Sequence, residues 1–65
     1  MIEYSNSEIL LLINDLVHSE RDRNILKRRL VDGVPYDRIA LEFSLSTRQI
    51  KRIVKRWRDT FNDRL

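Results

Sequence analysis

The segment from residue 46 to residue 61 constrains the fold most, because its apolar and cationic residues separate onto two sides of a helix. At about 100° per residue, one side collects the apolar residues Ile50, Ile53, Val54, Trp57 and Phe61. The other side collects the cations Arg48, Lys51, Arg52, Lys55, Arg56 and Arg58. No acid lies between Ser46 and Arg58. We therefore expect a helix that packs its apolar side on the domain and leaves its cations in solvent.

Capping signals place two further helices before this one. Ser5 and Glu8 form the pattern S-x-x-E, a capping box that predicts the start of the first helix. Its apolar residues follow helical spacing and are Ile9, Leu12, Ile13, Leu16 and Val17. Ser19 can cap a second helix, over about residues 20–32, and Gly33 suits the left-handed residue that closes it. The predicted buried set of this second helix is Ile25, Leu26, Leu30 and Val31.

A third helix is predicted to run to Phe43 with Pro35 in its first turn, because proline lacks a backbone N–H and has a fixed φ. Its predicted buried residues are Ile39, Ala40 and Phe43. Residues 44–46 make a tight connection, and Ser46 with Gln49 forms a second capping box. The sequence therefore predicts an all-α, compact four-helix fold in a single domain of residues 1–65.

The charges are distributed unevenly along the chain. Residues 1–24 carry five acids and two bases, whereas residues 25–65 carry eleven bases and five acids. This asymmetry indicates one surface suited to a polyanion.

The chain has no cysteine, its longest apolar run is the five residues 9–13, and it lacks a basic leader, so we expect a cytoplasmic protein that does not enter a membrane.

The cationic side of the fourth helix has the residue types that bind duplex DNA. A guanidinium offers a planar fork that matches guanine O6 and N7, so arginines near the start of the helix suit base readout. The candidate base contacts are Arg48, Lys51 and Arg52. The candidate phosphate contacts around them are Lys55, Arg56, Tyr36 and Arg38. Thr47 could contact a thymine methyl or a phosphate, and Ser46 is a further candidate DNA contact. The alternative for each single cation is a solvated surface charge.

The run from Tyr36 to Lys55 resembles the helix-turn-helix of bacterial sigma-factor region four and of LuxR-type regulators. In that family a small residue packs where the two helices cross, which Ala40 matches, and glycine is usual in the turn, where this chain has Ser44. The apolar positions of the motif are matched by Ile39, Phe43, Leu45, Ile50 and Ile53. The chain is also similar to short transcriptional regulators of phages and mobile elements. The resemblance implies transcription regulation, with residues 46–61 as the recognition helix in the major groove.

The sequence predicts no enzyme, no cofactor and no metal site, because it has no glycine-rich phosphate loop and His18 stands without other ligand residues. We expect a homodimer, with Leu11, Trp57 and Phe61 as candidate contacts. Two alternatives stay open. A sigma-like module would dock on RNA polymerase and contact DNA only in that assembly, and an RNA-binding module would have to use the narrow A-form groove.

Overall fold

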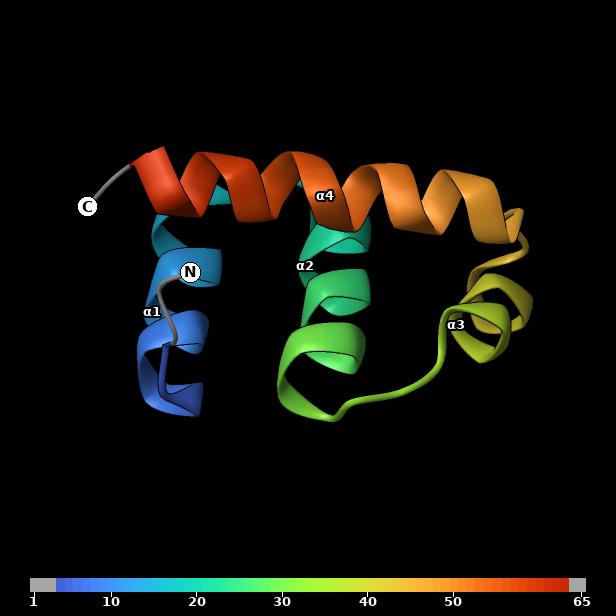
Figure 1. Cartoon of the computed structure of the whole chain (residues 1–65), viewed down its shortest axis with the longest axis horizontal. Coiled ribbons are helices and arrows are strands. Elements are labelled where there is room, and N and C mark those ends of the chain that lie inside the picture. Colours follow the sequence, from blue (N-terminus) through green and yellow to red (C-terminus); the bar gives the residue numbers. More distant parts are fainter. Residues whose placement is uncertain (1–3, 64–65) are drawn as a thin grey trace.

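The computed structural model describes residues 4–63, which form an all-α fold with four α-helices and one π-helical segment (Figure 1). The elements in chain order are α1 (Asn6–Leu16), α2 (Glu20–Leu26), η1 (Lys27–Val31), α3 (Tyr36–Phe43) and α4 (Thr47–Asp63). The long helix α4 lies across one end of α1 and of α2, and α3 lies beside its N-terminal half (Figure 1). The predicted all-α fold with four helices is confirmed.

The predicted start signals of α1 and α2 are confirmed at atomic detail. The Glu8 backbone N–H donates to the Ser5 hydroxyl at 3.2 Å, and the Ser5 N–H donates to the Glu8 carboxylate at 3.1 Å. This second bond lowers the pKa of Glu8, because it stabilises the ionised carboxylate. Ser19 caps α2 by accepting from the Asp22 N–H at 3.3 Å. Both helices therefore begin where the local sequence predicts.

The second helix departs from the predicted continuous α-helix of residues 20–32. After Leu26 the backbone widens into η1, where the Asp32 N–H donates to the Lys27 carbonyl, five residues back, at 3.1 Å. The wider turn changes the angular position of the residues that follow. Leu30 and Val31, predicted as buried, are consequently half-buried, whereas Ile25 and Leu26 are fully buried as predicted. Gly33 has the predicted positive φ, at 70°.

The connection between α3 and α4 is a tight left-handed turn at Ser44. Ser44 has φ 55° and ψ 39°, and the Leu45 N–H donates to the Ala40 carbonyl at 3.0 Å, closing the end of α3. Pro35 precedes α3 as its N-cap residue with extended backbone, one position earlier than predicted. The second capping box is confirmed, because the Gln49 N–H donates to the Ser46 hydroxyl at 3.1 Å and Ser46 N–H donates to Gln49 Oε1 at 2.9 Å.

The core lies along α4, from Ile50 to Phe61, and draws on every α-helix. Its buried apolar residues are Ile13, Val17, Ile25, Leu26, Ile39, Ala40, Ile50, Val54 and Phe61. Phe43, predicted as buried, is half-buried against this core. At the far end of α4 the Tyr4 hydroxyl donates to the Phe61 carbonyl at 3.0 Å. The core and this bond hold α4 on the rest of the domain.

Candidate nucleic-acid interface

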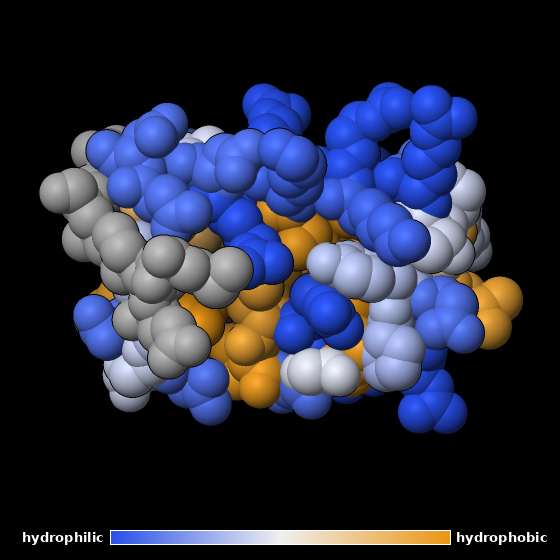
Figure 2. Space-filling view, viewed as in Figure 1, coloured by the Kyte–Doolittle hydropathy of each residue, from blue (hydrophilic) through white to orange (hydrophobic). Residues whose placement is uncertain are grey.

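The cationic side of α4 is open to solvent along its whole length. Its exposed cations are Arg48, Lys51, Arg52, Lys55, Arg56 and Arg58. On the opposite side Ile50 and Val54 are buried and Ile53 is half-buried. Hydrophilic side chains accordingly cover the edge of the molecule along α4, whereas apolar ones show below it, in the region of α1 and α2 (Figure 2). The helix therefore presents its cations outward, as a contact with a polyanion requires.

The cations at the start of α4 differ from Lys55, farther along the helix, in having no acidic partner among residues 4–63. Arg48 and Arg52 lie one turn apart and form no ion pair within residues 4–63. Farther along, the Lys55 ammonium lies 3.0 Å from an Asp59 carboxylate oxygen, so part of its charge is neutralised. Thr47 is half-buried, and the Ser46 hydroxyl accepts a backbone bond but keeps its own proton for donation. The first two turns of α4 therefore carry exposed cations without an acidic partner among residues 4–63.

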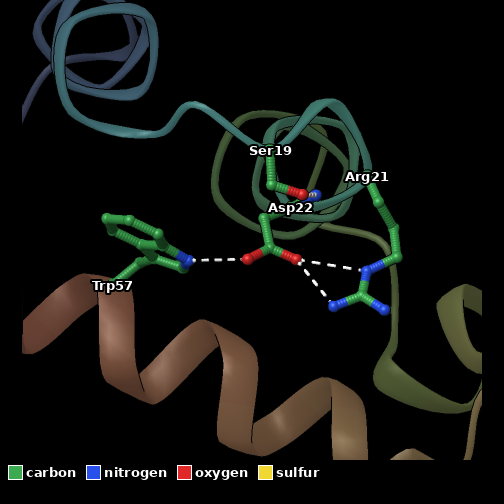
Figure 3. A network of polar contacts seen from close by, with 4 residues as sticks. All are labelled: Ser19, Arg21, Asp22 and Trp57. Carbon is green, nitrogen blue, oxygen red and sulfur yellow. Dashed lines mark hydrogen bonds and ion pairs between the residues drawn. The ribbon is translucent and has the colours of Figure 1, made fainter.

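A buried carboxylate on α2 fixes the orientation of α4 (Figure 3). The indole Nε1 of Trp57 donates to Asp22 Oδ2 at 3.1 Å, and Asp22 is only 8% exposed. Arg21 donates to the other oxygen, Oδ1, from Nε at 3.3 Å and from Nη2 at 3.2 Å. Trp57 also lies near Arg56, whose guanidinium is 5.5 Å from its ring centre. This link ties α4 to α2 at Trp57.

A second polar link joins η1 to α3. The Arg28 guanidinium donates to both carboxylate oxygens of Glu42, at 3.0 Å and 2.6 Å, and to Asp32 at 3.4 Å. The hydrogen bonds from Arg28 lower the pKa of Glu42, and the positive charge of Arg38 lowers it further. Arg38 itself is exposed on α3, so it is accessible to a phosphate. The bidentate pair holds α3 in place against the preceding helix.

Tyr36 brings together cations from two separate segments. The guanidinium carbon of Arg29 lies 4.2 Å from the centre of the Tyr36 ring, and the Lys51 ammonium lies 5.8 Å from the same centre. Arg29 is held there by donating to the Val34 carbonyl at 3.2 Å. Lys51, a candidate base contact by sequence, therefore leans toward α3 and away from the line of Arg48 and Arg52.

The three candidate dimer contacts differ in their exposure. Leu11 is 63% exposed on α1, as its position opposite the apolar stripe predicts, and Trp57 is half-buried. Phe61 is only 2% exposed, and its ring packs in the core, so its burial removes it from the candidate dimer contacts. Sequence reasoning missed Leu41, which is 83% exposed on α3. Its place opposite Ile39 and Ala40 on a short helix was the signal available.

No protein-family model, curated protein or solved structure matches this chain. Among residues 4–63, no helix combines the length and the apolar character that a span across a membrane needs.

Proposed function

We propose that this protein binds double-stranded DNA sequence-specifically as a transcriptional regulator, with α3 and α4 acting as a helix-turn-helix. The observation that carries the proposal is the outward face of α4, where six exposed cations lie opposite a buried apolar stripe. The major groove of B-form DNA is wide enough to admit a helix. The hydrogen bond from Trp57 to Asp22 and the packing of α4 on the core hold this helix in one orientation. Its cations would therefore meet the groove in a fixed register.

Within this interface the start of α4 recognises bases and its surroundings bind the backbone. Arg48 and Arg52 are the proposed base contacts, because both are exposed and unpaired within residues 4–63. Affinity then comes mainly from phosphate neutralisation. With about four to six phosphates engaged, log K falls against log salt with a slope of about −3.6 to −5.4. The proposed phosphate contacts include Ser46, Thr47, Lys55, Arg56, Tyr36 and Arg38.

We further propose that the protein acts as a homodimer. One module of this size buries only about 600–1,000 Å² on DNA, so a second copy raises both affinity and specificity. Leu11 and Trp57 are the remaining candidate contacts between copies. A palindromic or directly repeated binding site would support this arrangement, whereas a single short site bound by one chain would contradict it.

Selection of bound duplexes from a random pool tests the proposed function. The purified protein should enrich one sequence, and Arg48→Ala or Arg52→Ala should each cost about 1–3 kcal/mol and relax the preference at one base pair. Lys55→Ala is the matched control, because loss of a phosphate contact weakens all sequences alike. Enrichment only in the presence of RNA polymerase would favour a sigma-like module, and equal binding of duplex RNA would contradict recognition in the major groove.

A further inference from the structure

A basic hollow lies on the flank of α4, beside the face proposed to contact bases. Its volume is about 190 Å³, and it is lined by Tyr36 of α3 and by one stripe of α4 that includes Lys51, Lys55 and Arg58. These three cations are spaced at i, i+4 and i+7, so they project from the same side of α4 over two turns. The hollow is therefore a small concave surface with positive charge on one wall and an aromatic ring on the other.

A further cation, Arg29, lies beside the Tyr36 ring that borders this hollow. Arg29, from η1, is 4.2 Å from the ring centre, and its bond to the Val34 carbonyl fixes it beside the tyrosine. Arg29 and Lys51, from two segments, therefore lie near the Tyr36 ring, and Lys51, Lys55 and Arg58 line the hollow with it. Within residues 4–63 the one acid that lines the hollow is Asp59, which pairs with Lys55. Lys51, Arg58 and Arg29 form no ion pair among these residues.

We propose that this hollow binds one backbone phosphate of the duplex, through Lys51, Arg58 and the Tyr36 hydroxyl. A phosphate oxygen accepts strong bonds from ammonium, guanidinium and phenol donors, and the hollow offers all three. The proposal rests on the proposed DNA binding and adds to it in two ways. Lys51 binds the backbone instead of a base, and Arg58, in the second half of α4, joins the interface.

Asp59 has a defined place in this arrangement. Its carboxylate repels a phosphate in the hollow and also withdraws Lys55 from it. Removal of that one negative charge should therefore strengthen binding of every duplex sequence, by about three-fold for a charge near the protein surface.

The test uses the selected duplex with single phosphates replaced by neutral methylphosphonates, one position at a time. One position should weaken the wild type by about ten-fold, the loss of a charged hydrogen bond. Lys51→Ala and Arg58→Ala should weaken the unmodified duplex and lose that sensitivity at the same position, with base preference unchanged. Each should also reduce the salt slope by about 0.9. Arg56→Ala is the matched control, because it lies on the other side of α4, beside Trp57, and should keep the sensitivity.

Four results would overturn the proposal. Two results would show that the hollow does not hold a backbone phosphate. In the first, Arg58→Ala loses as much affinity as the wild type at every methylphosphonate position, and in the second, Asp59→Asn gains no affinity for the duplex. In a third result, inorganic phosphate shifts the nuclear magnetic resonances of Tyr36 and Lys51, but no methylphosphonate position weakens DNA binding. That result would assign the hollow to free phosphate. Wild-type protein that binds no duplex at all would refute the proposed function as well, whereas the other three results leave DNA binding intact.

Discussion

Removal of the hydrogen bond from Trp57 to Asp22 is the strongest single test of how α4 is held on α2. Trp57→Phe keeps an aromatic ring at this position but removes the Nε1 donor, which leaves Asp22 Oδ2 without its 3.1 Å partner. A hydrogen bond to a charged group contributes about 1.5–3 kcal/mol, because the carboxylate is nearly buried. The smaller ring adds about 0.5 kcal/mol of lost apolar burial. The expected loss in the free energy of unfolding is therefore about 2–3.5 kcal/mol.

This loss is large for a chain of 65 residues, whose total stability should be about 3–10 kcal/mol. The melting temperature should fall by about 10–20 °C. Urea unfolding followed by circular dichroism is the assay, because Trp57 is the one tryptophan of the chain and the variant has no indole fluorescence. Arg21→Ala serves as control. This variant removes the other partner of Asp22. Because the Arg21 side chain is exposed, the loss should cost at most about 1 kcal/mol of unfolding free energy.

A double-mutant cycle separates the bond from the change of ring. In the Asp22→Ala background, Trp57→Phe should cost about 1–2 kcal/mol less than in the wild type, because the partner is already gone. Equal costs in the two backgrounds, or a cost below about 0.5 kcal/mol in the wild type, would refute the argument that this bond fixes α4.

Three further predictions concern the elements that support the interface. Ser44→Gly should stabilise the fold by about 0.5–1 kcal/mol in urea unfolding, because a left-handed serine costs about 1–2 kcal/mol and glycine loses part of that gain to unfolded-state entropy. Ala40→Leu should destabilise it by about 1–3 kcal/mol by overpacking, because Ala40 is 5% exposed under α4; an unchanged midpoint would contradict the tight contact. The lowered pKa of Glu42 gives stability that is present above about pH 4.3, its unfolded value, and is lost as the pH falls through the lower folded value. Urea midpoints measured on acidification should therefore fall less steeply in Glu42→Gln, and identical pH profiles would exclude the Arg28–Glu42 pair as the cause.

Local signals in the sequence predicted the helices well. Both capping boxes depend on residues three positions apart, so Ser5 with Glu8 and Ser46 with Gln49 could be recognised from spacing alone. The two sides of α4 follow from helical periodicity in the same way. The exposure of the cations needed no knowledge of the other helices, since the apolar stripe already determined which side would pack.

Features that depend on tertiary contacts were not predictable. Trp57 and Asp22 are 35 positions apart, and nothing in either segment indicates the other. The π-helical turn after Leu26 has no glycine or proline to mark it, and it displaced Val31 from its predicted place in the core. Phe61 satisfied the apolar periodicity of α4 as well as an interface residue would, so periodicity alone could not separate core from contact surface. The cluster of Arg29 and Lys51 at Tyr36 likewise depends on how η1 meets α3.

The central claim is that the exposed cations at the start of α4 contact the bases of duplex DNA. Titration of isotopically labelled protein with its selected duplex, followed by nuclear magnetic resonance, tests it residue by residue. The largest changes should fall on the side-chain N–H groups of Arg48 and Arg52, with small changes along α1, and a duplex with one altered base pair should reduce the change at one of these arginines. Changes centred on α1 instead, or equal changes with any duplex sequence, would contradict the account.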